Sequence, residues 1–350
     1  MNKLFTFIVL WMMSCLPTLA QAPMDGGVWK DNTGKHINAH GGNIFNYKGI
    51  YYWYGESRSQ DGKPYSSLGV SCFTSKDLKS WKNHGLVLPV SNEPGSDIEG
   101  GCIIERPKVL YNKKTKKFVM WFHLELKGKG YAAARYGVAT SDTPFGPFKF
   151  VRSGRVNPGI YPVGFAKPDT TDLKHQLLFP ELKNWWTPEW RKQIERGMFW
   201  MRDFAGGQMS RDMTIFIDDD GKAYHIYSSE DNLTLQIAQL TDDYMQHNGS
   251  YVRVAAGGQN EAPTIFKQDG IYWMIPADVP VGRLMQPVCS RLRTSTVLGS
   301  SCLIHVVVRV PTKPSALRVP LYIRWKQQHR RRCSMALTMC SWLICGIQNT

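Results

Sequence analysis

The sequence has no apolar run long enough to cross a membrane. The N-terminal run, Leu4–Met13, falls well short of the roughly 20 residues that a membrane-spanning helix needs. Lys3 precedes this run and an A-x-A cleavage site follows it at 20–22, so we interpret residues 1–22 as a signal peptide. The sequence therefore predicts a secreted or periplasmic mature protein with no stable membrane span.

Cysteine is scarce in the body of the chain. Five of the eight cysteines lie in residues 276–350, and Cys15 lies in the signal, which leaves Cys72 and Cys102. A lipoprotein would use Cys15 as its anchor, but the two residues before it make a poor lipobox, so lipid anchoring is not expected. Cys72 and Cys102 either form a disulfide in an oxidising compartment or remain two buried thiols.

Acidic residues are few at the end of the chain. The formal net charge of +15 is typical of nucleic-acid binders. However, residues 276–350 hold eleven Lys or Arg and one acid, Asp278, so ten of the fifteen charges lie there. The charge is therefore a property of this segment, and nucleic-acid binding is not expected of the rest.

What the sequence does have is a repeated pair of hairpins. Asn43–Glu56 forms two short runs around a Lys48-Gly49 turn, with the alternation and aromatic content of strands. The same pattern returns at Pro107–Leu124, Asp212–Glu230 and Glu261–Ile275. A second motif, a strand followed by Ser or Thr and then Asp in a turn, occurs at Gly69–Trp81, Gly137–Phe148 and Leu235–Tyr244.

Four strands per unit, at a period of roughly 50 residues, predict an all-β fold, namely a five-bladed β-propeller. A β-sandwich is the alternative, although sandwiches do not repeat a two-hairpin unit in order. We assign residues 23–275 to the propeller. About four blades are encoded there, and the last blade is expected to be missing or scrambled.

Residues 152–205 interrupt the repeat. Thr187 and Pro188 form a helix start, with Thr as N-cap and Pro in the first turn, and we expect the helix to run to about Asp203. The segment is rich in tryptophan: Trp185, Trp186, Trp190 and Trp200. It forms either a lid or ligand-stacking wall, or a flap that packs against the side of the propeller.

From about Pro276 the strand alternation stops. One interpretation is a basic interaction tail. The other is a frameshift, because the shifted frame permits globular strings: TSGCTGWAPNAARL across 275–289, TFGAQST across 313–320 and HVFMADLWNPEY across 338–350. Some positions are forced, since Met285 followed by Gln286 must give Ala. We therefore predict that residues 276–350 are an aberrant, poorly ordered tail.

In a propeller, the first residues of each innermost strand face the central channel, where ligands bind. His40, Glu105 and Glu261 occupy equivalent positions in the repeat. His40 either binds ligand hydroxyls or is structural, and Glu56 at the end of the first hairpin either contacts ligand or is a solvated acid. Glu105 stands beside Arg106 and is expected to be ionised, although an exposed ion pair would contribute little.

The Asp218–Gly221 cluster resembles a calcium loop in composition only. It lacks the other ligands and the Glu at position twelve of such loops, so a plain hairpin turn is expected. The sequence supports no metal site and no cofactor, and it does not support a structural calcium ion.

Several motifs resemble glycoside hydrolase family 43. ERPK (105–108), SRDMT (210–214) and NEAPTIF (260–266) are similar to the heads of its inner strands. INAHGGNIF (37–45) and YYWYGE (51–56) resemble the exo-β-1,3-galactanase (galactan 1,3-β-galactosidase) branch of that family. The resemblance implies a five-bladed propeller and an inverting attack on a glycosidic bond, by a general acid and an activated water.

The resemblance also implies roles for single residues. Glu261 matches the general acid, whose pKa must be raised if it is to hold a proton at neutral pH. Glu105 matches the carboxylate that raises the pKa of that acid by like-charge repulsion and orients the sugar. The positions that match sugar contacts of the family are Glu56, Arg106, Asp212 and Asn232. His40 is a further candidate for sugar binding.

The catalytic base is the departure from the family pattern. Most members carry an Asp base in the first blade, whereas NAHGG (38–42) contains none. The galactanase branch also lacks that Asp and is thought to use a Gln of the last blade. In the shifted frame this Gln falls at residues 317–318, so the base is absent from this translation.

The expected function is therefore that of a secreted glycosidase, an inverting exo-β-1,3-galactosidase acting on galactan or arabinogalactan. The alternatives are an α-L-arabinofuranosidase or β-xylosidase of the same family, or an inactive carbohydrate-binding propeller. The expected partner is a polysaccharide or oligosaccharide, nucleic acid is not expected, and the protein is expected to be a monomer.

Overall fold

The computed structural model describes residues 28–59, 67–165, 187–258, 260–268, 271–277, 290–297 and 301–307. The expected signal peptide, residues 1–22, lies outside the described residues. Within them, no helix is both long and apolar enough to cross a membrane. The described chain folds mainly into four antiparallel sheets, each of four strands.

Each sheet is built from strands that are consecutive in the chain. The first sheet contains β1 (His40–Tyr47), β2 (Ile50–Arg58), β3 (Ser67–Ser75) and β4 (Lys82–Pro89). The second contains β5 (Ile103–Asn112), β6 (Lys117–Glu125), β7 (Arg135–Ser141) and β8 (Lys149–Gly154). The third contains β9 (Met213–Ile217), β10 (Ala223–Ser229), β11 (Thr234–Leu240) and β12 (His247–Val254). The fourth contains β13 (Glu261–Gln268), β14 (Ile271–Ala277), β15 (Ser290–Val297) and β16 (Ser301–Val307).

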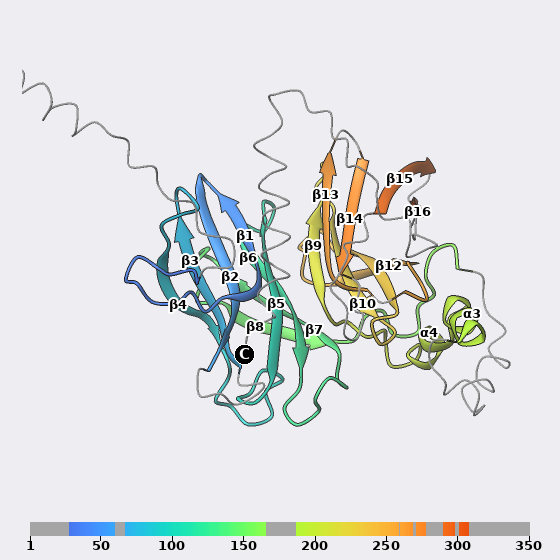
Figure 1. The fold of residues 1–350 in the computed structure, drawn as a ribbon, viewed down its shortest axis with the longest axis horizontal. Coiled ribbons are helices and arrows are strands. Elements are labelled where there is room, and N and C mark those ends of the chain that lie inside the picture. The colour runs from blue at the N-terminus through green and yellow to red at the C-terminus, as the bar shows by residue number, and fades with distance from the viewer. Residues whose placement is uncertain are drawn as a thin grey trace, which may run out of the picture.

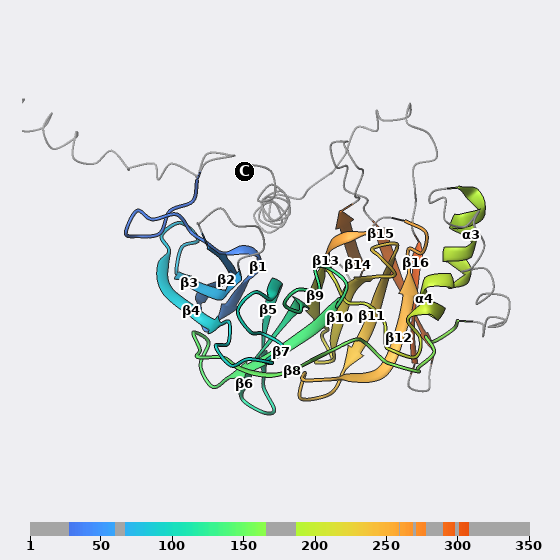
Figure 2. The same cartoon turned by 90° about the horizontal axis from the view of Figure 1, so that it is seen from below.

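The four sheets are the blades of a β-propeller, as the repeat predicted. The innermost strands β1, β5, β9 and β13 follow one another in chain order, because β5 contacts both β1 and β9, and β13 contacts β9 (Figure 1). Figure 2 shows the blades fanning outward from these strands. Four separate sheets exclude the β-sandwich alternative, which has two.

Large apolar side chains fill the spaces between neighbouring blades. Phe118 and Phe122 lie in the cluster between the first and second blades, Trp121 and Tyr227 between the second and third. Met274 packs between the third and fourth. The alternation of each strand supplies one set of side chains to each side, which explains why both faces of a blade are rich in aromatic and β-branched residues.

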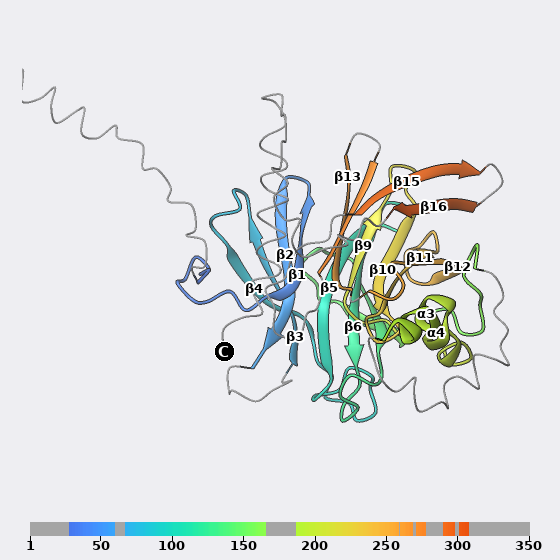
Figure 3. The ribbon, with the colours of Figure 1, turned by 45° about the vertical axis from the view of Figure 1, so that its right-hand side comes forward.

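The part of the insertion described from residue 187 onward contains two short helices that lie beside β12 (Figure 3). In α3 (Pro188–Arg196) the Thr187 side chain accepts the backbone N–H of Trp190 at 3.1 Å, as expected of an N-cap. The single helix that was expected to reach Asp203 ends at Gly197, whose φ of 101° is left-handed, and α4 (Met198–Arg202) follows.

Two of the four insertion tryptophans are fully buried. Trp190 and Trp200 pack with Ile194 and with Leu233 of the third blade, so neither ring offers a face to a ligand. Both belong to a flap packed against the propeller. The other two, Trp185 and Trp186, lie outside the described residues.

Two further expectations are decided by the fold. Cys72 and Cys102 are separate buried thiols, so the disulfide alternative is wrong. Asp218–Gly221 forms the turn between β9 and β10, as predicted, and the Asp218 carboxylate accepts from Lys267 at 2.9 Å and from Tyr272 at 2.5 Å. The acidic turn therefore joins the third blade to the fourth.

The segment from residue 276 onward contains strands that the sequence did not indicate. β15 and β16 pair with each other, and β15 pairs with β14, which completes the fourth sheet. The remainder of 276–350, apart from the end of β14, lies outside the described residues. The frameshift interpretation therefore stays a prediction.

Candidate active site

Three of the four inner strands begin with the same irregularity. The strand register shifts just after His40, Glu105 and Glu261. The residue that follows each has a positive φ, of 53° at Gly41, 53° at Arg106 and 41° at Ala262. A β-bulge bends its strand and re-aims the neighbouring side chains. The equivalence predicted from the repeat therefore extends to the local backbone.

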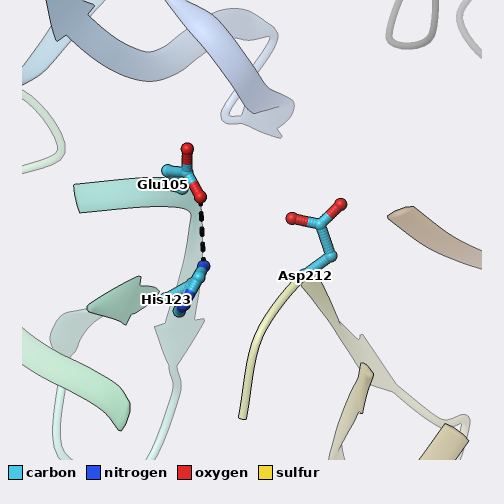
Figure 4. Close-up of side chains that lie close together, drawn as sticks. All are labelled: Glu105, His123 and Asp212. Atoms are coloured by element: carbon cyan, nitrogen blue, oxygen red, sulfur yellow. Dashed lines mark ion pairs between the residues drawn. The ribbon is translucent and has the colours of Figure 1, made fainter. Parts of the chain in front are cut away.

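Glu105 is surrounded by donors. Its Oε1 accepts from the Tyr131 hydroxyl at 2.9 Å and lies 3.5 Å from Nη2 of Arg58, while its Oε2 lies 3.2 Å from Nδ1 of His123 (Figure 4). Burial alone raises the pKa of Glu105, but His123, with help from Tyr131, outweighs it and lowers the pKa. Glu105 is ionised, as expected, although through His123 and not through the adjacent Arg106.

His123 joins two carboxylates inside the second blade. Its Nε2 lies 2.9 Å from Oε1 of Glu125, which is fully buried and whose Oε2 accepts the Ala134 N–H at 2.9 Å. Burial alone lowers the pKa of His123, but Glu105 and Glu125 together raise it to about 9. The imidazole is therefore protonated at neutral pH, and it holds the Glu105 carboxylate in one orientation.

Arg106 and Asp212 form a two-bond ion pair between the second and third blades. The Nε–Oδ1 distance is 2.9 Å and the Nη2–Oδ2 distance is 2.7 Å, a geometry that gives strong, oriented pairs. Oδ2 of Asp212 also accepts the Ala262 N–H at 3.1 Å, which ties in the fourth blade. Burial raises the pKa of Asp212, but Arg106 outweighs it and lowers the pKa. The two expected sugar contacts therefore face each other.

Glu56 is a buried acid beside Glu105. Only 5 % of it is exposed, and its Oε1 lies 2.9 Å from Nη2 of Arg58. Burial raises the pKa of Glu56, and the Glu105 charge raises it further, to about 7, against the opposing effect of Arg58. His40 lies opposite Glu56 in the β1–β2 register, and burial, followed by the charge of Arg58, lowers its pKa.

Within the described part of the chain, no cation forms an ion pair with Glu261 as His123 does with Glu105. Its Oε1 accepts from Nδ2 of Asn232 at 2.7 Å. Burial raises its pKa first, and the charge of Asp212 raises it further, while two neighbouring arginines oppose the shift and Glu105 contributes least. Glu261 therefore holds a proton at higher pH than an ordinary glutamate. Asp212, more than Glu105, is the carboxylate that produces this effect.

Lys108 fixes two of the bulges to each other. It is buried, and its Nζ donates to the carbonyls of Gly41 at 3.0 Å, Gly42 at 3.1 Å and Arg106 at 3.3 Å. Burial, and then the Arg106 charge, lowers its pKa to about 7. The lysine thereby sets the spacing between the heads of β1 and β5.

Glu105, His123 and Asp212 each place a potential ligand atom within 4.8 Å of the others (Figure 4). Such a group could hold a metal ion only with a neutral histidine. Here His123 carries a proton at neutral pH, and each carboxylate already faces a cation, His123 or Arg106. The three side chains form an ion-pair network, which accounts for their proximity without a metal.

Sequence reasoning missed His123, Tyr131, Arg58 and Lys108 as site residues. A single histidine inside an aromatic strand was the available signal for His123. Counting the register back from the Asn112–Lys117 pair without a bulge would have placed Glu105 opposite Leu124, whereas the bulge places it opposite His123. The pairing therefore depended on a backbone irregularity that the sequence does not reveal.

Comparison with known proteins identifies relatives of this fold and site. A family model described as "Glycosyl hydrolases family 43" matches residues 187–302. A family 43 β-1,3-galactosidase solved with galactodeoxynojirimycin is 55% identical, with 76% of each chain covered and a TM-score of 0.70. No curated protein sequence matches the chain.

Two further structures are more distant. An exo-β-1,3-galactanase from Clostridium thermocellum is 32% identical, with a TM-score of 0.59, over 80% of this chain and 51% of that one. One from Phanerochaete chrysosporium, solved with galactose, is 29% identical, with a TM-score of 0.55, over 79% and 52%. This chain thus spans about half the length of each.

A propeller that brings together two glutamates with pKa values shifted in opposite directions has the kind of carboxyl pair that a glycosidase uses. The relatives identify the glycosidase family. The chain belongs to glycoside hydrolase family 43.

Proposed function

We propose that the protein is a secreted, inverting exo-β-1,3-galactosidase that releases galactose from galactan or arabinogalactan. The observation that carries the proposal is the raised pKa of Glu261 at a strand head equivalent to that of Glu105, whose pKa is lowered. The names of the relatives, which include β-1,3-galactosidases and exo-β-1,3-galactanases, support the substrate class. The signal peptide predicted at residues 1–22 supports secretion.

In this proposal Glu261 is the general acid that protonates the leaving oxygen. Burial and the Asp212 charge keep the proton on Glu261 towards neutral pH, where an acid of this kind works best. Asn232 donates to Oε1, which leaves Oε2 as the oxygen that carries the proton. The hydrogen bond therefore decides which side of the carboxyl group faces the leaving group.

Glu105 stays ionised and orients the sugar by accepting from its hydroxyls. His123 and Tyr131 hold its carboxylate, so little reorganisation accompanies binding. Glu56, with a pKa of about 7, is able to donate or accept near neutral pH and is proposed as a second hydroxyl contact. His40, Arg106 and Asp212 are proposed to complete the sugar-binding wall.

Inversion also needs a base to activate water. The family resemblance assigns this role to a Gln of the last blade, which in the shifted frame would fall at residues 317–318, outside the described residues. We propose that the frame-restored chain has full activity and that the chain as translated has little. An inactive, carbohydrate-binding propeller is the alternative for the translated form.

The test compares the translated and the frame-restored chains on β-1,3-galactobiose, followed by proton NMR. The expected product is galactose whose α-anomer forms first, because inversion of a β-linkage gives α. An initial β-anomer would contradict inversion. Release of arabinose or xylose from aryl glycosides, with galactobiose untouched, would replace the galactosidase proposal with another family 43 specificity.

A further inference from the structure

The turn between β10 and β11 has an unusual backbone. Three consecutive residues are left-handed, with φ of 53° at Glu230, 56° at Asp231 and 68° at Asn232. Residues other than glycine rarely adopt this conformation, and strained residues persist only where their surroundings hold them. The third residue, Asn232, is the one that donates to Glu261.

The first residue of the turn is held by β12. Glu230 is fully buried, and Arg253 binds both of its oxygens, with Nε–Oε1 and Nη2–Oε2 distances of 2.7 Å. The same guanidinium donates to the carbonyls of Ile194 at 3.0 Å and Glu195 at 3.3 Å, near the C-terminal end of α3. Arg253 therefore joins the turn to the helical insertion.

The second residue of the turn is held by α4. Oδ2 of Asp231 lies 2.6 Å from Nη1 of Arg202, and its Oδ1 lies 3.4 Å from Nη2 of Arg211. Arg202 is itself oriented by Asp203, with Nε–Oδ1 and Nη2–Oδ2 distances of 3.0 and 2.8 Å. The insertion thus contacts the turn directly at Asp231, through Arg202, and indirectly at Glu230, through Arg253.

Apolar packing fixes the far side of the same turn. Leu233 is buried in the core of the insertion together with Trp190, Ile194 and Trp200. The backbone carbonyl of Asn232 accepts the N–H of Asn260 at 2.8 Å, and Asn260 immediately precedes Glu261. The turn is therefore clamped between the insertion and the head of β13.

We propose that the insertion is a positioning element for Glu261: Arg202 and Arg253 hold the strained turn so that the Asn232 amide stays on Oε1 of Glu261. This inference rests on the proposed role of Glu261 as the acid and goes beyond it. Without the clamp the turn relaxes and Asn232 withdraws from Glu261. The ionised carboxylate then loses a donor, so the pKa of Glu261 rises, and the carboxyl group is free to rotate.

The test measures the pKa of Glu261 in the full chain by carbon NMR of labelled glutamate carboxyls, with Glu261→Gln identifying the resonance. Asn232→Ala sets the maximum expected rise, about one unit. Arg202→Met is expected to approach that value. Arg191→Met, an equal charge change at an exposed position of α3, is the control. No rise in Arg202→Met, or the same rise in the control, would overturn the proposal.

A matched pair at residue 231 tests the strain directly. Asp231→Ala and Asp231→Gly both remove the carboxylate that binds Arg202, but only glycine adopts a φ near 56° at little cost. The alanine variant should therefore raise the pKa of Glu261 more than the glycine variant. Equal pKa shifts in the two variants would show that backbone strain at residue 231 plays no part in positioning Glu261.

Kinetics separate this inference from the proposed function. If the frame-restored protein hydrolyses galactobiose, Arg202→Met in that protein should lower kcat about tenfold with KM little changed, because only acid assistance is impaired. On β-galactosyl fluoride, whose leaving group needs no proton, the same variant should keep its rate. Equal losses on both substrates would overturn the inference. If no galactoside is cleaved, the proposed function fails, and the NMR titration still decides the positioning role.

Discussion

The inner strands of the second and fourth blades have the same local backbone conformation near their starts, but the pKa values of their glutamates are shifted in opposite directions. Near the start of both inner strands, a glutamate is followed by a bulge residue of positive φ, Arg106 or Ala262. His123 lies opposite Glu105 in the strand register, whereas Ala277 lies opposite Glu261. The imidazolium lowers the pKa of Glu105, while burial and Asp212 raise the pKa of Glu261.

The comparison teaches that the repeat fixes where a carboxylate stands, and its neighbours fix what it does. The first blade shows a third version, because its bulge begins at His40 and the acid, Glu56, lies on the opposite strand. The equivalent register position therefore pairs different residues in the three blades: His40 with Glu56, Glu105 with His123, and Glu261 with Ala277. Burial and neighbouring charges, which differ between the blades, set the direction in which the pKa of each glutamate moves.

Replacing Glu261 by Gln should have the largest effect on activity. The amide keeps the shape and the contact with Asn232 but cannot give a proton, so kcat should fall about 10³-fold, within the usual range for a general acid. Binding of galactobiose, measured by calorimetry, should persist. Retention of full activity in the frame-restored chain would remove Glu261 from the acid role.

Replacing Glu105 by Gln should lower the raised pKa of Glu56 and leave the raised pKa of Glu261 nearly unchanged. The Glu105 charge is the second cause of the raised pKa of Glu56 but the weakest of those named for Glu261. We therefore expect the pKa of Glu56 to fall clearly below about 7, that of Glu261 to change little, and kcat to fall about 10²-fold. NMR titration of the two carboxyls checks this. An equal fall at both would mean that Glu105, and not Asp212, governs the acid.

Replacing His123 by Ala should make the second blade resemble the fourth. Glu125 is fully buried and would lose its cation, so we expect a loss of about 3–5 kcal/mol in the free energy of unfolding at pH 6.5. The folded pKa of His123 is about 9 and its ordinary value is 6.5. Its stabilisation is therefore fully present below pH 6.5 and is lost as the pH rises through 9.

Urea unfolding of the wild-type and His123→Ala proteins at pH 6.5 and pH 9.5 measures this difference. The deficit of the variant should shrink at the higher pH, where the wild-type histidine is also neutral. Tyr131→Phe, which removes one donor to Glu105 and leaves Glu125 untouched, is the control. A deficit that is the same at both values of pH would contradict the protonated state of His123.

The smallest expected effect lies outside the site, between the second and third blades. Nδ1 of His225 lies 3.0 Å from Nε2 of His247, and burial lowers the pKa of His247 to about 3, from an ordinary 6.5. Stability linked to His247 is thus present above pH 6.5 and lost as the pH falls towards 3, by about 2 kcal/mol at pH 5. His247→Gln should flatten this acid loss in thermal unfolding, without changing the pKa of Glu105 or Glu261. An unchanged acid loss would assign it to groups other than His247, of which His225 is the nearest, because burial also lowers its pKa well below 6.5.

The strand and hairpin pattern made most of the fold predictable. The Lys48-Gly49 turn and the runs around it gave β1 and β2, because period-two alternation is a local property. The helix start at Thr187 was also local and correct, since capping involves neighbours in the chain. The break at Gly197 was missed although a glycine after the last helical residue is a local stop signal. Strands β15 and β16 were not foreseen, because pairing across the fourth sheet is non-local.

The candidate acids were visible in the sequence because the repeat aligned Glu105 with Glu261. Their surroundings were not. Arg58, His123 and Tyr131 converge on Glu105 from three separate places in the chain, and no spacing rule connects them.

By itself, then, the sequence determined the propeller, its repeat and the positions of the carboxylates, since each depends on alternation and local turns. Only the tertiary structure decided that Arg106 binds Asp212, that His123 lies against Glu105, and that Asn232 donates to Glu261. The reason is physical: pKa values and ion pairs depend on burial and on distances of a few ångströms between residues that are far apart in the chain.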